Sequence, residues 1–223
     1  MTKKITILSL LIMLAAPRIT WSQVDFVDFA TERMIDSLLA HMTLDEKVGQ
    51  MTLFTSDWDV TGPTLRPGYR DDVRAGRVGA IFNAHTADYN RELQRMAVEE
   101  TRLGIPLLFG YDVIHGYRTI FPMPLGEAAS WDSVAVENAA RIAGTEAAAA
   151  GLHWTFAPMV DIARDPRWGR IMEGSGEDTY LGSVLARARV RGFQGDDLGD
   201  PLTVLACAKH YAAYGAAQAG RDY

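Results

Sequence analysis

The stretch Pro106-Leu-Leu-Phe-Gly-Tyr-Asp112 shows the pattern that decides the fold of this 223-residue chain. A continuous apolar run without polar alternation is typical of a parallel β-strand that is covered on both faces. The run ends in an aspartate, so a charged side chain lies at the carboxyl end of the predicted strand. Such a strand predicts an α/β protein with functional groups at one edge of its sheet.

Four other apolar runs repeat this strand pattern, at residues 50–54, 78–82, 153–160 and 203–208. Helical patterns lie between them at residues 88–103, 133–150 and 177–192, and a short helix follows the capping box Thr43-Leu-Asp-Glu46. Asp132 is the predicted N-cap of the second of these helical patterns. The alternation of strands and helices predicts a parallel sheet.

Glycine positions and strand-end residues distinguish two parallel-sheet folds. A dinucleotide-binding sheet carries G-x-G-x-x-G at its first strand–helix turn, but the nearest match, at Gly174 and Gly176, lacks the final glycine and follows a loop. Charged residues instead follow three successive predicted strands, at Asp112, Asp161 and Lys209-His210. This arrangement favours a (β/α)8 barrel, of which about five strand–helix units are present. An open sheet remains the alternative, because it also binds ligands at its strand ends.

Composition excludes several classes of protein. The chain has 22 basic and 28 acidic residues, a net charge of −6, so we expect no nucleic-acid partner. Its single cysteine, Cys207, excludes an internal disulfide framework and a cysteine-based zinc ribbon. His41, His85 and His153 lack the spacing of metal ligands. We therefore expect neither a metal nor another cofactor.

Residues 1–22 have the pattern of a secretory signal peptide. Lys3 and Lys4 precede the apolar stretch Ile5–Ala16, and Thr20-Trp21-Ser22 supplies small residues before the expected cleavage site at Gln23. The apolar stretch is shorter than the roughly 20 residues of a spanning helix. The sequence thus predicts a periplasmic or secreted protein without a membrane anchor after cleavage.

Five ordered motifs resemble glycoside hydrolase family 3 and, within it, periplasmic β-glucosidases. They are Gly110-Tyr-Asp-Val-Ile-His-Gly116, Phe156-Ala-Pro-Met-Val-Asp161, Arg164-Asp-Pro-Arg-Trp-Gly-Arg170, Glu173-Gly-Ser-Gly-Glu-Asp-Thr-Tyr180 and Ala208-Lys-His-Tyr-Ala-Ala-Tyr-Gly215. The resemblance covers nearly all of residues 23–223 and implies the N-terminal barrel domain of that family. It implies a small oligosaccharide or β-glucoside as the substrate.

The resemblance implies that Asp112, Arg170, Lys209 and His210 bind the sugar. A carboxylate can accept from two hydroxyls, and a guanidinium offers a planar fork of donors. Asp112 has an alternative role as the cap of the turn that follows its strand. Neighbouring strand residues point to opposite faces, so Lys209 and His210 can share a ligand only if the backbone twists, bulges or has unusual peptide geometry.

Lys209 also has an alternative role in another class of enzyme. A barrel lysine can form a Schiff base with a carbonyl substrate, as in aldolase-type enzymes. The flanking motifs favour sugar binding. Borohydride trapping with a carbonyl substrate separates the two hypotheses, because a covalent adduct on Lys209 would contradict sugar binding.

Three further residues are candidates for supporting roles. His115 fixes its loop by a hydrogen bond or, by the resemblance, lies near the site. Trp168 can stack on a sugar face, although buried aromatic residues usually belong to the core. Glu173 lies in an acidic loop with Glu177 and Asp178. Two such carboxylates could flank a glycosidic bond, but we expect these three to brace Arg170 through ion pairs.

One departure from the family narrows the substrate class. The N-acetylglucosaminidase branch carries a catalytic histidine in a Pro-Gly-His-Gly pattern after Lys-His, whereas this chain reads Tyr211-Ala-Ala-Tyr-Gly-Ala-Ala-Gln218. The resemblance therefore implies hydrolysis of terminal non-reducing β-D-glucosyl residues. A related β-xylosidase or exo-glucanase remains an alternative.

A second departure concerns catalysis. The family acts by a retaining double displacement with an aspartate nucleophile in a Val-Ser-Asp-like motif and a separate acid/base carboxylate, and neither motif occurs here. We expect residues 23–223 to be the N-terminal portion of a barrel, with the catalytic carboxylates beyond Tyr223 and the complete site dependent on a missing C-terminal domain. The alternative is a non-catalytic sugar-binding remnant or the inactive product of a truncated gene.

Overall fold

The computed structural model describes residues 28–59 and 62–221, and the predicted signal sequence, residues 1–22, lies outside them. The chain divides into two compact units at His41 and Met42. In the first unit, helix α2 (Phe29–His41) begins at Asp28, whose carboxylate accepts hydrogen bonds from two backbone N–H groups of the first turn. Among the described residues, no helix is both long and apolar enough to span a membrane.

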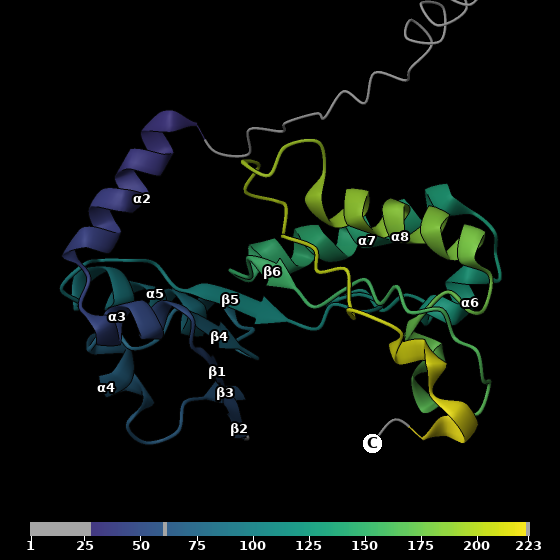
Figure 1. Cartoon of the computed structure of the whole chain (residues 1–223), viewed down its shortest axis with the longest axis horizontal. Helices are drawn as coiled ribbons and strands as arrows, with labels where there is room; N and C mark the ends of the chain where they lie inside the picture. Colours follow the sequence, from purple (N-terminus) through teal and green to yellow (C-terminus); the bar gives the residue numbers. More distant parts are fainter. Residues whose placement is uncertain (1–27, 60–61, 222–223) are drawn as a thin grey trace, which may run out of the picture. The chain divides into compact units, whose positions relative to one another are not determined.

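A parallel sheet forms the centre of the second unit (Figure 1). Its strands are β1 (Leu53–Thr55), β4 (Ala80–Phe82), β5 (Leu108–Tyr111) and β6 (Trp154–Thr155). They are hydrogen-bonded in the order β1-β4-β5-β6, which follows the chain without reversal. The prediction of an α/β protein with a parallel sheet is therefore confirmed. Three of the predicted strand segments contain β4, β5 and β6, and the predicted segment 50–54 overlaps β1.

The fifth predicted strand, residues 203–208, is not a continuous strand in the structure. This segment runs beside β6 through isolated parallel bridges, Trp154 with Leu205 and, further along, Met159 with Lys209. Between the two bridges lies Pro158, which has no N–H to donate to a ladder. The described residues thus form a four-stranded sheet extended by a bridged fifth segment, and they do not close a barrel.

Helices connect and cover these strands. They are α3 (Leu44–Gln50), α4 (Tyr69–Arg74), α5 (Ala87–Glu99), α6 (Pro124–Ala128), α7 (Ser133–Ala149) and α8 (Thr179–Gln194). The four expected helices are confirmed as α3, α5, α7 and α8, and the Asp132 side chain caps α7 as predicted. Helix α5 ends at Glu99, earlier than the expected residue 103. Helices α4 and α6 were not expected, because six and five residues are too few for a periodic pattern. The antiparallel hairpin of β2 (Asp57–Asp59) and β3 (Gly62–Thr64) was not expected either.

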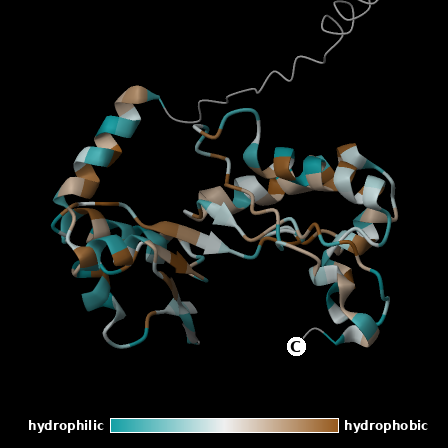
Figure 2. Cartoon of the chain, in the orientation of Figure 1, coloured by the Kyte–Doolittle hydropathy of each residue, from teal (hydrophilic) through white to brown (hydrophobic). Residues whose placement is uncertain are grey.

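The main core lies between the sheet and its helices. Ile81 and Phe109, on β4 and β5, are almost fully buried and pack with Leu93 and Met96 of α5. Figure 2 shows mainly hydrophobic colours on these strands and alternating colours along α8. Helices α7 and α8 lie side by side (Figure 1) and approach closely at Gly192, where an added Cβ would lie 2.5 Å from the Cβ of Ala140.

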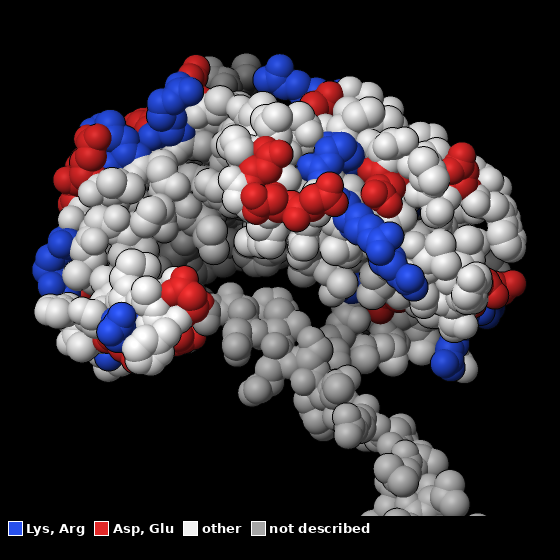
Figure 3. All heavy atoms as spheres, turned by 90° about the horizontal axis from the view of Figure 1, so that it is seen from above, with Lys and Arg blue, Asp and Glu red and all other residues white. Residues whose placement is uncertain are grey.

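Several ion pairs lie at the surface of the second unit. Exposed or half-exposed pairs include Arg70 with Glu92, Arg74 with Glu100 and Arg77 with Asp72. On the face shown in Figure 3, acidic and basic side chains are interspersed. Each such pair contributes little to stability by itself, about 0–1 kcal/mol.

The ion pair between Glu46 and Arg102 is different, because it also completes the start of α3. Glu46 forms the predicted capping box with Thr43, and its carboxylate accepts from Nε and Nη2 of Arg102 at 3.0 and 2.6 Å. The hydrogen bonds from Arg102 and from the Thr43 backbone lower the pKa of Glu46 from 4.5 to about 2. The stabilisation that depends on its charge is therefore present above about pH 4.5 and is lost as the pH falls through 2.

We expect Glu46→Gln to lower the free energy of unfolding at neutral pH and to lose this deficit as the pH falls from about 4.5 to 2. Denaturant titration of the parent and the variant across that pH range is the measurement. Glu92→Gln is the matched control, since Glu92 pairs with Arg70 at the exposed surface. A deficit of equal size at pH 2 and pH 7 would contradict the electrostatic origin.

Candidate functional site

The first part of the candidate site joins the end of β5 to the end of the bridged fifth segment. Asp112 directly follows β5, and its Oδ1 lies 3.1 Å from Nζ of Lys209. The Lys209 side chain is 15% exposed and that of Asp112 is 46% exposed. The structure thus brings together two residues that the sequence placed at the ends of separate strands, and the accessible carboxylate can accept hydrogen bonds from a ligand.

The second part is a forked ion pair on the 3₁₀ helix η1 (Gly169–Glu173). Nε and Nη2 of Arg170 donate to the two carboxylate oxygens of Glu173 at 2.6 and 2.7 Å. This pair raises the pKa of Arg170 and lowers the pKa of Glu173. The positive charge of Lys209 also lowers the pKa of Glu173.

The side chain and the backbone of His210 are both held by Asp161, which the sequence does not place among the sugar-binding residues. Oδ2 of Asp161 accepts from the backbone N of His210 at 2.9 Å and lies 2.8 Å from its Nδ1. The peptide bond between Lys209 and His210 is cis, so the unusual peptide geometry considered from the sequence is present. Both side chains of this dipeptide bind carboxylates, Lys209 that of Asp112 and His210 that of Asp161.

Tyr214 connects the parts of the site. Its hydroxyl accepts from Nη1 of Arg170 at 3.4 Å, and its ring meets that of His210 edge-on, with centroids 4.7 Å apart. On another side Tyr214 meets Trp168, which is 1% exposed and belongs to a small core cluster with Met159 and Ala163. The structure thus places Trp168 in the core, where its ring packs against that of Tyr214.

The acidic loop after Arg170 differs in part from expectation. Glu173 braces Arg170 as predicted, but the same role for Glu177 and Asp178 is wrong. Asp178 is the N-cap of α8 and accepts from the backbone N of Leu181 at 2.6 Å, while Glu177 is exposed. A helix start leaves unpaired N–H groups, and the short side chain of Asp178 satisfies one of them.

His115 and Asp165 each make contacts that fix a loop. His115 lies in its loop with Nδ1 3.1 Å from the carbonyl of Phe121, which is the loop-fixing contact considered from the sequence. The carboxylate of Asp165 accepts from Arg167 and from the backbone N of Ala219. These hydrogen bonds lower the pKa of Asp165 and fix the loop against the segment that follows Tyr214.

Asp161 and Tyr214 are the functional candidates that sequence reasoning missed. Asp161 ends an apolar run, which predicts that it follows a strand but does not indicate its partner. Tyr214 lies in the Lys-His motif itself. The signal was present in both cases, but the pairing depends on the register between two segments about 50 residues apart.

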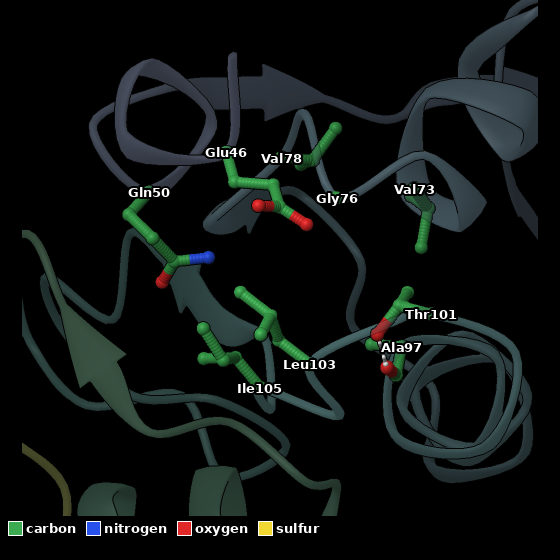
Figure 4. A pocket seen from close by; sticks show the side chains of 9 residues that line it. All are labelled: Glu46, Gln50, Val73, Gly76, Val78, Ala97, Thr101, Leu103 and Ile105. Atoms are coloured by element: carbon green, nitrogen blue, oxygen red, sulfur yellow. Dashed lines mark hydrogen bonds between the residues drawn. The ribbon is translucent and has the colours of Figure 1, made fainter. Parts of the chain in front are cut away.

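Neither the hollow drawn in Figure 4 nor a metal-binding group among the described residues forms a competing site. The hollow in Figure 4 lies between α3 and the α4–α5 region, and Glu46, Gln50, Leu103 and Ile105 are among its lining residues. Its cavity volume is about 20 Å³, which admits a single water and no sugar ring. Within residues 28–59 and 62–221, no group of three or more His, Cys, Asp or Glu side chains could hold a metal ion.

Comparison with known proteins decides the family. Residues 43–223 match the family model described as the glycosyl hydrolase family 3 N terminal domain. The chain belongs to glycosyl hydrolase family 3. The match starts at the capping residue of α3 and includes every residue of the candidate site.

Individual relatives of this family 3 chain are β-glucosidases by name. A periplasmic β-glucosidase of Salmonella typhimurium is 45% identical over 195 residues, 87% of this chain and 25% of the relative. A periplasmic β-glucosidase/β-xylosidase of Dickeya chrysanthemi is 33% identical over 220 residues, 86% of this chain and 33% of the relative.

Solved structures that resemble this chain are also β-glucosidases by name. A β-glucosidase from Listeria innocua in complex with isofagomine has a TM-score of 0.75 and 41% identity, over 85% of this chain and 27% of that enzyme. A mutant of the same enzyme in complex with laminaribiose has a TM-score of 0.76 and 38% identity, over 85% and 28%. The chain thus spans about a quarter to a third of the length of these relatives.

Proposed function

We propose that this chain is the sugar-binding portion of a β-glucosidase-type glycoside hydrolase that removes terminal non-reducing β-D-glucosyl residues. The observation that carries the proposal is the cluster built on the Lys209–His210 dipeptide. Within it, the ammonium and the imidazole of this dipeptide lie with a carboxylate and a guanidinium from segments far apart in the sequence. Such a set offers both acceptors and donors to the hydroxyls of a rigid sugar ring.

Three of these groups, on Asp112, Lys209 and Arg170, have distinct roles in this proposal. Asp112 accepts hydrogen bonds from hydroxyls, while Lys209 donates and remains oriented by Asp112 at 3.1 Å. Arg170 uses Nε and Nη2 to bind Glu173 and one hydrogen of Nη1 to bind Tyr214, and the second hydrogen of Nη1 can bind a sugar hydroxyl. Because these partners fix each side chain before the ligand arrives, little conformational entropy remains to be lost on binding.

Glu173 is not suited to act as the general acid of this site. A general acid at neutral pH needs a raised pKa, whereas the forked hydrogen bonds of Arg170 lower the pKa of Glu173. We therefore propose that the aspartate nucleophile and the acid/base of a retaining mechanism come from residues beyond Tyr223. In the full-length protein, a further domain would complete the site.

The relatives also support the substrate class and the cellular location. Their names include β-glucosidase and β-glucosidase/β-xylosidase, and the laminaribiose complex shows that one such enzyme binds a β-linked disaccharide. We extend to this chain the preference for β-glucosides, with β-xylosides as the alternative. Two relatives are periplasmic by name, in agreement with a periplasmic or secreted location for this protein.

The Schiff-base alternative for Lys209 requires a neutral amine as the nucleophile. In the structure, Nζ of Lys209 lies instead in an ion pair with Asp112. This contact favours a role as a hydrogen-bond donor. Borohydride trapping without any adduct on Lys209 is the expected result.

Hydrolysis assays test the proposal. The 223-residue chain is expected to release no nitrophenol from p-nitrophenyl β-glucoside above the uncatalysed rate. A longer product, extended through a Val-Ser-Asp motif if the reading frame continues past Tyr223, is expected to be active. Enzymatic turnover by the purified 223-residue chain would contradict the placement of the nucleophile, and a stop codon at that point would favour the sugar-binding remnant.

A further inference from the structure

The side chain of Asp161 is buried more completely than the other acidic side chains in the ion pairs of the site. It is 2% exposed, against 24% for Glu173 and 46% for Asp112. Burial of a carboxylate is costly unless hydrogen bonds compensate the loss of water. Among the described residues, Asp161 forms its ion-pair contact with His210, so the compensation comes from this histidine.

The geometry of the contact restricts where the histidine carries its proton. A single oxygen, Oδ2, accepts from the backbone N of His210 at 2.9 Å and lies 2.8 Å from the ring Nδ1. An ionised carboxylate offers no hydrogen to donate, so the nitrogen that faces it must carry the hydrogen. The hydrogen bond from the backbone N of His210 to the same oxygen also fixes the main chain of this residue, so the ring stays next to Oδ2.

We propose that Asp161 is a positioning residue that holds the His210 ring in the Nδ1–H tautomer, with Nε2 as a hydrogen-bond acceptor for the ligand. The ring also makes a T-shaped contact with the ring of Tyr214, at a centroid distance of 4.7 Å. Its side chain remains 31% exposed, and Nε2 has no hydrogen-bond partner among the described residues. Nε2 is thus the ring nitrogen available to a ligand.

This tautomer defines which ligand group the Lys209–His210 dipeptide recognises. The ammonium of Lys209 donates only, and a neutral imidazole with its hydrogen on Nδ1 accepts at Nε2. A group that satisfies both must accept one hydrogen bond and donate another, which a hydroxyl does. The inference rests on the proposed function for the identity of that hydroxyl as one of a sugar, but the tautomer itself does not depend on it.

Nuclear magnetic resonance of the chain labelled with ¹⁵N at histidine tests the tautomer directly. Two-bond ¹H–¹⁵N correlations distinguish Nδ1–H, Nε2–H and doubly protonated rings, and the spectrum of His210→Gln assigns the signal of His210. At neutral pH we expect the neutral Nδ1–H form. The Nε2–H form or a doubly protonated ring would overturn the proposal.

Two substitutions separate positioning from a merely structural role. Asp161→Asn keeps a carbonyl oxygen in place of Oδ2 and is expected to retain the Nδ1–H tautomer. Asp161→Ala removes the acceptor and is expected to shift the ring towards Nε2–H, the form that predominates in water. A lower melting temperature of Asp161→Ala with an unchanged tautomer would contradict the proposal. If Asp161→Ala does not fold, the spectra of the parent and of Asp161→Asn still show whether the His210 ring carries its hydrogen on Nδ1.

Titration with glucose links the tautomer to binding. We expect Asp161→Ala to bind glucose about tenfold more weakly than the parent, because one oriented hydrogen bond is lost, and Asp161→Asn to recover most of the affinity. Equal affinity of the parent and Asp161→Ala would contradict the positioning role. If the parent itself does not bind glucose, the proposed function fails, while the tautomer of His210 is still judged by the spectrum.

Discussion

Arg189→Ala is expected to lower the free energy of unfolding by about 3–5 kcal/mol, which is a large part of the stability of an ordinary domain. Arg189 lies on α8 with a side chain that is 4% exposed, and its Nη2 donates to the carboxylate of Glu127 on α6 at 2.6 Å. Burial lowers the pKa of Arg189, while the carboxylate of Glu127 opposes that shift. Removing the guanidinium leaves a carboxylate that is 10% exposed without its cation.

The ion pair of Arg189 and Glu127 also lies near the loop that carries Asp112. Glu127 and Arg189 line a small cavity together with Val113 and His115, which follow Asp112 in the chain. The loop that carries Asp112 therefore packs against the elements that this ion pair joins. We expect the loss of the pair to loosen the Asp112 loop as well as α6 and α8.

Denaturant unfolding of Arg189→Ala and of the double variant Glu127→Leu/Arg189→Met measures the effect. The double variant is expected to lose much less stability, because apolar residues of similar volume often replace a buried ion pair at little cost. Arg95→Ala is the surface control, since its exposed pairs with Glu99 and Glu100 contribute little. A loss below about 1 kcal/mol for Arg189→Ala would contradict a buried, interdependent pair.

Asp112→Asn is expected to weaken the binding of glucose to this chain by about 10- to 100-fold. The substitution replaces a charged acceptor, and hydrogen bonds to charged groups are worth about 1.5–3 kcal/mol. It also removes the anion that orients Nζ of Lys209. The fold should be retained, because the Asp112 side chain is 46% exposed.

Calorimetric titration with glucose measures this loss, with Asp72→Asn as the matched control. Asp72 forms a comparable ion pair with Arg77, at 2.6 Å, away from the candidate site. We expect the control to bind glucose as the parent does. Equal affinities of Asp112→Asn and the parent would show that Asp112 does not contact the sugar.

The strand-end residues illustrate what could be predicted from the sequence. The apolar run that ends at Tyr111 fixed the position of Asp112, because a buried parallel strand must be followed by a polar turn at the edge of the sheet. Capping chemistry is equally local, so the starts of α3 and α7 could be predicted at Thr43 and Asp132.

The partners of the site residues depend on information that is not local. Asp161 meets His210 because the segments that hold Met159 and Lys209 pair in one particular register. A shift by one residue would turn the side chains of either segment to the other face. Local chemistry also competes for the same side chains, and for this reason Asp178 caps α8 and does not bind Arg170.

The most direct test of the central claim is a ¹H–¹⁵N correlation spectrum of the 223-residue chain during titration with glucose. We expect the largest chemical-shift changes at Asp112, Arg170, Lys209, His210 and Tyr214. We expect no comparable change around the hollow lined by Glu46 and Gln50. Saturating shifts confined to residues outside the Lys209–His210 cluster, or no shifts at any glucose concentration, would contradict the assignment of this cluster as a sugar-binding site.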